Sequence, residues 1–184
     1  FVYNIRGTMQ KKGWINMSKE VIYSSDGRII EGVIVKYYEE GRKMSETPYI
    51  NGLKNGTEIE YYYNGNISAK NEYVDGELNG ISYVYYQSGN LMEENPYKNG
   101  RLNGVRRRFY DTGMLQEEAE YQKDVLNGKV NRYSPDGTLE ETIYFRKGSQ
   151  AEEHPEILEQ KIKEEAEKNS KKNMLTQEEL NKLI

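Results

Sequence analysis

The sequence predicts a mostly β protein: an elongated single-layer twisted antiparallel sheet of repeated 24-residue β-hairpins, followed by a short α-helical C-terminal tail. A fixed period along the chain is the first observation, because it is typical of a repeat array. The second is composition: the 184 residues include 17 tyrosines but are only 35% hydrophobic, too few for a conventional sandwich core. The third is that residues 151–184 contain neither tyrosine nor glycine.

Each repeat begins at a glycine, and five copies follow one another directly. The opening glycines are Gly32, Gly56, Gly80, Gly104 and Gly128. The fifth residue after each of them is aromatic, and the ninth is again glycine. We therefore expect a strand of about six residues and a three-residue loop, formed by a type I turn and a glycine in the left-handed region. Such a loop pairs the aromatic residue with the aliphatic residue two positions past the second glycine.

The second strand of each repeat runs to another aromatic residue and a second turn. These aromatic residues are Tyr49, Tyr73, Tyr97, Tyr121 and Phe145. An Asn-Gly or Asp-Gly turn signal follows in the first three repeats, whereas Asp124 replaces the glycine in the fourth. The register across this turn stays open, because Leu78, Leu102 and Leu126 have the wrong parity for a simple alternation of faces.

We divide the chain into an irregular N-terminal cap at 1–31, five repeats at 32–148 and a charged helical tail at 149–184. The cap contains a degenerate unit, since residues 23–27 match the turn at 133–137. Trp14 either covers the open end of the sheet or is an exposed binding anchor, because tryptophan is favoured at interface hot spots.

The tail has the pattern of two helices, near 155–169 and 176–184. Pro155 suits the first position of a helix, and Thr176 with Glu179 forms a capping box. Three arrangements are open: the tail caps the last hairpin, lies along the groove of its own or a neighbouring sheet, or docks on another protein. A short helix needs such a contact to be stable.

The repeat resembles a known family. The pattern Gly-x4-Tyr-Tyr-x2-Gly-x-Leu, followed by Tyr-x-Asn-Gly-x-Leu-Asn-Gly, is similar to that of the MORN-repeat variant family, labelled in bacteria the YwqK-like antitoxin component family. The resemblance covers residues 32–148. It implies an elongated antiparallel sheet with a protein- or lipid-interaction role, and it implies no catalytic residues and no cofactor.

The chain has few residues suited to catalysis or metal binding. It contains no cysteine, so thiolate metal sites and thiol nucleophiles are excluded. His154 is the single histidine and lies outside the repeats, so a Ser-His-acid arrangement is not supported. We expect a protein that is not an enzyme and that has no metal site.

The sequence predicts a scaffold that holds a protein or peptide, antitoxin-like by resemblance, in the groove of its twisted sheet. Our first candidates for partner binding are the second aromatic residues of the repeats, together with Trp14. They are Tyr38, Tyr62, Tyr86 and Tyr110. Two alternatives are a membrane- or lipid-associated envelope protein and a structural component that assembles end to end through its sheet edges.

Two charged sets occupy equivalent positions in the repeats. Glu93, Glu117 and Glu141 form either an acidic strip for a basic partner or a solvated face. Arg106 and Arg108 form either a basic patch or pairs with neighbouring acidic side chains. A net charge of −4 and an isoelectric point near 5.3 argue against nucleic acid as a partner.

The sequence leaves the location open between bacterial cytoplasm and cell envelope. It contains no apolar run with the length of a signal core or a membrane span. It begins with Phe1 instead of methionine, so we expect a trimmed chain or one processed from a longer precursor.

Overall fold

The computed structural model describes residues 14–16, 22–151, 156–157, 160 and 163–169. Within these residues, sixteen strands form one antiparallel sheet. The strands are β1 (Trp14–Asn16), β2 (Ile22–Tyr23), β3 (Ile29–Tyr37), β4 (Lys43–Ile50), β5 (Leu53–Lys54), β6 (Gly56–Tyr61), β7 (Ile67–Val74), β8 (Glu77–Leu78), β9 (Gly80–Tyr85), β10 (Leu91–Lys98), β11 (Arg101–Leu102), β12 (Gly104–Phe109), β13 (Leu115–Gln122), β14 (Val125–Tyr133), β15 (Leu139–Arg146) and β16 (Ser149–Gln150).

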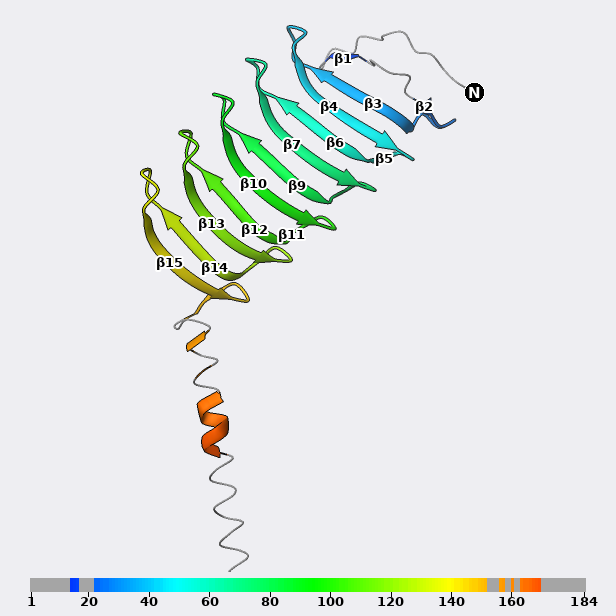
Figure 1. The fold of residues 1–184 in the computed structure, drawn as a ribbon. Helices are drawn as coiled ribbons and strands as arrows, with labels where there is room; N and C mark the ends of the chain where they lie inside the picture. Colours follow the sequence, from blue (N-terminus) through cyan, green and yellow to red (C-terminus); the bar gives the residue numbers. More distant parts are fainter. Residues whose placement is uncertain (1–13, 17–21, 152–155, 158–159, 161–162, 170–184) are drawn as a thin grey trace, which may run out of the picture.

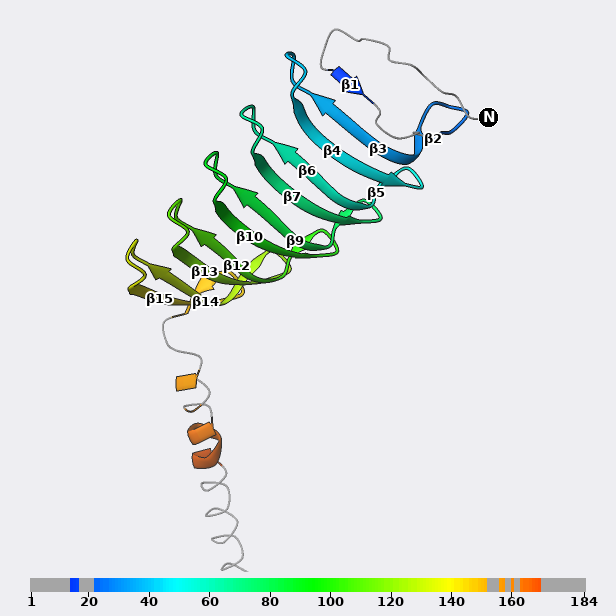
Figure 2. The ribbon, with the colours of Figure 1, turned by 45° about the horizontal axis from the view of Figure 1, so that its top comes forward.

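The hairpins lie side by side in chain order, so the sheet is a curved ribbon (Figures 1 and 2). The three-residue loops of the five repeats lie along one edge of this ribbon, and the two-residue turns lie along the other (Figure 1). We call these the loop edge and the turn edge. The loop between β2 and β3 lies at the same edge as the two-residue turns. The predicted fold class, a mostly β single-layer sheet of hairpins, is therefore confirmed.

The three-residue loops have the predicted form. In the second repeat, Tyr62 N–H donates to the carbonyl of Asn66 at 2.8 Å, and Gly65 N–H donates to the carbonyl of Tyr62 at 2.9 Å. Gly65 has a φ of +91°, which a side chain would strain. A register shift then places Tyr61 opposite Ile67, so the predicted pairing of aromatic and aliphatic residue is confirmed.

The two-residue turns settle the register that the sequence left open. Asn99 and Gly100 both have positive φ, 51° and 71°, which defines a type I′ turn. Tyr97 therefore lies directly opposite Leu102 and on the same face. The fourth repeat makes the same turn without glycine, since Lys123 and Asp124 have φ values of 52° and 70°.

Because side chains alternate between the faces of a sheet, the ladder assigns each repeat position to one of two faces. We call one the crowded face, because small or polar side chains near its middle are buried. They are Ser45, Thr47, Glu58, Ser82, Asn95, Ala119 and Val130. The other, which we call the open face, carries the pairs of aromatic and aliphatic residues at the loop edge.

The tail is helical at 156–157, 160 and 163–169, and all these residues are exposed. In both views these residues lie beyond the last hairpin and do not cover the sheet (Figures 1 and 2). Docking of this part of the tail on its own sheet, one of the three expected arrangements, is therefore not observed. The predicted helix at 176–184 and His154 lie outside the described residues. No helix among the described residues is long and apolar enough to cross a membrane.

Candidate binding surface

The predicted partner-binding tyrosines link successive repeats. Each hydroxyl donates a hydrogen bond to the backbone carbonyl of a residue 23 positions later in the chain. The four bonds are Tyr38 to Tyr61 at 2.8 Å, Tyr62 to Tyr85 at 2.6 Å, Tyr86 to Phe109 at 2.8 Å and Tyr110 to Tyr133 at 2.9 Å. These tyrosines are half-buried, and their hydroxyls are occupied within the chain. The structure shows that these four tyrosines link neighbouring repeats. That they also bind a partner stays a prediction.

The turn edge has a second set of bonds between repeats. The second residue of each two-residue turn donates its backbone N–H to a carbonyl of the preceding repeat. Gly100 donates in this way to Leu78 and Asp124 to Leu102, at 2.8 and 2.9 Å. The repeats are thus joined at both edges, beyond the ladder between neighbouring strands.

The glutamates of the predicted acidic strip pair with arginines on the crowded face, including both arginines of the predicted basic patch. Glu93 contacts Arg108 at 3.0 Å, Glu117 contacts Arg106 at 2.5 Å, and Glu141 contacts Arg132 at 3.0 Å. Neither set is therefore a charged surface of one sign. On the open face, Arg107 contacts Glu118 at 2.8 Å and Glu94 at 3.4 Å, which agrees with the expected alternation.

Glu58 is the most buried carboxylate of the crowded face, with 6% of its surface exposed. It accepts hydrogen bonds from Thr47 Oγ1 and Lys54 Nζ, both at 2.8 Å. Burial acts to raise the pKa of Glu58, but these two hydrogen bonds and the Lys54 charge outweigh it, and the pKa lies below its usual value. The ammonium group of Lys54 also lies 4.5 Å from the ring centre of Tyr73. This cluster links β4, β5, β6 and β7 on the crowded face.

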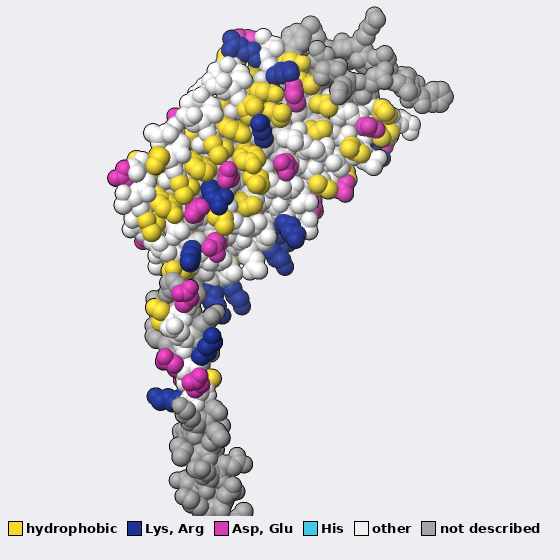
Figure 3. Space-filling view, viewed as in Figure 1, with side chains coloured by type: hydrophobic (Ala, Val, Ile, Leu, Met, Phe, Trp, Pro, Cys, Tyr) yellow, Lys and Arg dark blue, Asp and Glu magenta, His cyan; other side chains and the backbone are white. Residues whose placement is uncertain are grey.

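The open face carries a continuous apolar band along the loop edge. It consists of aromatic and aliphatic residues that lie opposite each other in the ladder. The pairs are Tyr61 with Ile67, Tyr85 with Leu91, Phe109 with Leu115 and Tyr133 with Leu139. Leu139, in the last of these pairs, exposes 51% of its surface. Ile81 lies on the same face, opposite Pro96 and toward the turn edge, and exposes 39%. Figure 3 shows this face, with yellow side chains in a band interrupted by single charged groups.

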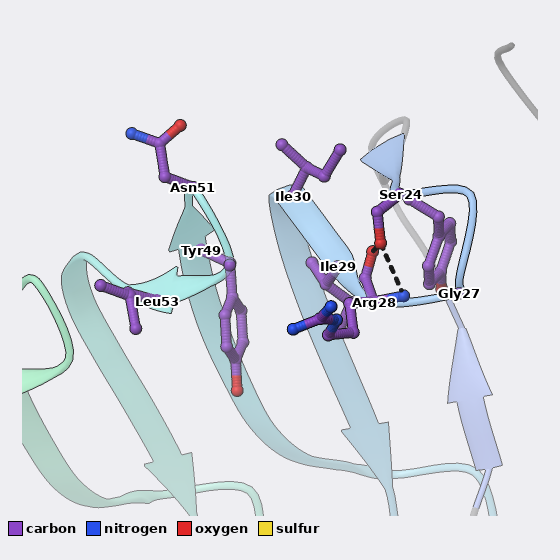
Figure 4. A pocket seen from close by; sticks show the side chains of 10 residues that line it. Ser24, Gly27, Arg28, Ile29, Ile30, Tyr49, Asn51 and Leu53 are labelled. Carbon is purple, nitrogen blue, oxygen red and sulfur yellow. Dashed lines mark hydrogen bonds between the residues drawn. The ribbon is translucent and has the colours of Figure 1, made fainter.

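A cavity of about 790 Å³ lies at the N-terminal end of the turn edge (Figure 4). Tyr49 and Leu53 line it on one side, and Arg28, Ile29 and Ile30 on the other. Ser24 Oγ donates to the carbonyl of Arg28 at 3.1 Å, and this contact holds the turn that closes one wall. The cavity has no cluster of acidic or histidine side chains. No group of three or more metal-binding side chains occurs anywhere in the described part of the chain.

Trp14 lies in β1, whose backbone pairs with β3 so that Trp14 is opposite Tyr37. The strand therefore adds to the N-terminal end of the sheet. Its side chain lies outside what the structure describes, so the two expected roles of Trp14 stay predictions.

Sequence reasoning did not select two surfaces that the structure makes prominent. One is the apolar band of the open face, although its two residue positions were identified as a pair. The other is a group of cations on the turn edge, at Lys98, Arg101 and Lys123. A comparison of equivalent positions between repeats reveals the second group, because the first repeat has Ile50 and Leu53 where the third has Lys98 and Arg101.

The architecture defines the class: an open array of β-hairpins that offers extended surfaces for binding. Comparison with known families then identifies the family of the chain. The family model described as "MORN repeat variant" matches four consecutive repeats, at 54–75, 78–99, 102–123 and 126–147. The chain belongs to this family, whose repeats are protein- or membrane-binding modules. No curated protein matches the chain.

Proposed function

We propose that this protein is a non-enzymatic scaffold that binds a protein or peptide partner along the open face of its sheet. The observation that carries the proposal is the apolar band, which runs across four repeats on one face. No described strand or helix packs over this band. The crowded face is a poorer candidate, since its charges are paired with each other and its central side chains are buried.

The chemistry of the band suits a protein partner. Tyrosine and phenylalanine rings offer large contact areas at a low cost in conformational entropy. Exposed apolar surface that is contiguous marks interaction sites, whereas scattered apolar residues do not. Charged groups such as Arg107 and Glu94 lie beside the band and would fix the orientation of a bound segment.

Two exposed residues of the open face allow a direct test. Ile81→Ser and Leu139→Ser, combined in one variant, remove apolar surface without opening a cavity, because both side chains are already largely exposed. We expect affinity capture from a native lysate to lose the specific partner of the wild-type chain. Circular dichroism and thermal unfolding should stay unchanged.

Ile50→Ser is the matched control. Ile50 is 46% exposed and lies on the same face, but it belongs to the first repeat, outside the four repeats that form the band, so partner capture should persist. Equal capture by the wild type and the Ile81/Leu139 variant would contradict the proposal. A second wild-type comparison, between the full chain and a chain ending at Gly148, separates binding by the sheet from binding by the tail.

Two narrower roles stay predictions beside this proposal. In an antitoxin, the partner bound by the scaffold would be a toxin, and rescue of growth by co-expression with the toxin is the test. In an end-to-end assembly, the terminal strands β1 and β16 would join copies, and light scattering would show a size that grows with concentration.

A further inference from the structure

The third repeat places two cations where the fold does not need them. Lys98 and Arg101 flank the turn at Asn99 and lie directly opposite each other in the ladder. Like charges in such a pair destabilise a hairpin. The first repeat makes the same turn with Ile50 and Leu53 at the equivalent positions, so the turn itself does not require charge.

These two cations line a recess together with a third. Lys98, Arg101 and Lys123 surround a cavity of about 340 Å³ between two successive turns, and Asn99 and Asn103 complete its wall. Within the described residues, none of the three cations forms an ion pair. The arginines of the sheet faces differ in this respect, since each pairs with a glutamate. Those arginines are Arg106, Arg107, Arg108 and Arg132.

The acidic groups nearby do not neutralise the recess. Asp124 uses its carboxylate to accept a hydrogen bond from the backbone N–H of Leu102 at 2.7 Å. Glu77 lies beside Gly100 in the preceding turn. The following turn adds two further exposed cations, Arg146 and Lys147. Figure 3 shows the resulting group of Lys and Arg side chains along the lower right edge of the sheet.

We infer that this recess binds acidic side chains of an extended polypeptide segment that runs along the turn edge. Successive turns are separated by two strands, about 9.6 Å. Three residues of an extended segment in the polyproline II conformation complete one turn and span about 9.3 Å, so every third side chain points the same way. Carboxylates at every third residue of a partner therefore meet the cations of successive turns. A recess between turns admits a side chain, whereas a flat layer of lipid headgroups contacts only the turn tips. Lys98 and Arg101 lie on the open face but at the turn edge, away from the apolar band at the loop edge, so this site does not depend on the band.

The test uses a labelled peptide with glutamate at every third position, separated by serines, and fluorescence anisotropy with the full chain. The variant Lys98→Ile, Arg101→Leu, Lys123→Ser removes the recess cations and gives the turn the residues of the first repeat. We expect its affinity for the peptide to fall about tenfold, because each exposed ion pair contributes up to a few-fold. Its unfolding temperature should rise, because the like-charge pair is gone.

A control variant removes the same number of positive charges from the sheet faces: Lys36→Ser, Lys70→Ser, Lys129→Ser. Its affinity for the peptide should change less than about twofold, since exposed charges more than a Debye length away are screened. Equal peptide binding by the recess variant and the wild type would overturn the inference. A lower unfolding temperature of the recess variant would also overturn it, because the cations would then be structural.

Two further arms exclude other anions. Vesicles of phosphatidylcholine containing phosphatidylserine test a membrane surface, and inorganic phosphate tests a free oxyanion. Binding of either through the recess cations, without peptide binding, would overturn the inference. Peptide binding that the recess variant loses, and that inorganic phosphate competes with only weakly, would support it.

Discussion

The hydroxyl bonds between repeats predict a measurable loss of stability. In the double variant Tyr62→Phe, Tyr86→Phe, two bonds of 2.6 and 2.8 Å to backbone carbonyls disappear while the rings remain. One such bond contributes about 1 kcal/mol. The two bonds lie between different pairs of repeats, so their effects should add to about 2 kcal/mol. For a chain of this size, the unfolding temperature should fall by roughly 4–8 °C.

Urea unfolding followed by far-ultraviolet circular dichroism measures this loss for each single variant and for the double variant. Tyr63→Phe is the control, because the Tyr63 hydroxyl donates to the exposed side chain of Glu40 and Tyr63 is 43% exposed. We expect the control to change the free energy of unfolding by less than about 0.5 kcal/mol. Losses below about 0.3 kcal/mol for both Tyr62→Phe and Tyr86→Phe would refute the structural role of this row.

Two further predictions concern the crowded face and a repeat boundary. Glu58→Gln should lower the free energy of unfolding by an amount on the order of 1–3 kcal/mol at neutral pH, because the Lys54 ammonium group loses its carboxylate partner. The folded pKa of Glu58 lies below its ordinary value of 4.5, so this difference from wild type should be present above pH 4.5 and vanish as the pH falls through the folded pKa. Gly80→Ala should lower the free energy of unfolding by more than about 1 kcal/mol, measured by urea unfolding. Gly80 has a φ of +134°, and an added Cβ would lie 2.9 Å from Cβ of Glu72. Equal stability of this variant and the wild type would contradict the prediction.

Local chemistry made the hairpins predictable. The loop with Gly65 requires a left-handed residue at a fixed place, and that requirement fixed both the loop type and the pairing of Tyr61 with Ile67. The second turn was harder, because its register depends on two residues with positive φ. Asp124 shows why: it adopts a φ of 70° without being glycine, so the turn is set by the ladder on both sides as well as by sequence.

The candidate site was less predictable because its residues act between repeats. Tyr62 was predicted to bind a partner, yet its hydroxyl reaches a carbonyl 23 residues later, which depends on the spacing of neighbouring hairpins. The pairing of charged residues also depends on contacts between neighbouring strands. Glu117 was part of an acidic strip, but the register brings Arg106 and Arg132 within 2.5 and 3.4 Å of it, and the strip becomes a row of ion pairs.

Repeats provide internal controls for assigning function. Positions that build the array keep their chemistry in successive copies, as the tyrosine at Tyr38 and Tyr62 does, because every interface between repeats needs the same bond. At the turn edge, the equivalent residues change from Ile50 to Val74 to Lys98 while the turn keeps its geometry. Since the fold tolerates all three side chains there, stability alone does not account for the cation of the third repeat. We therefore propose that the charge at this position serves binding at the turn edge.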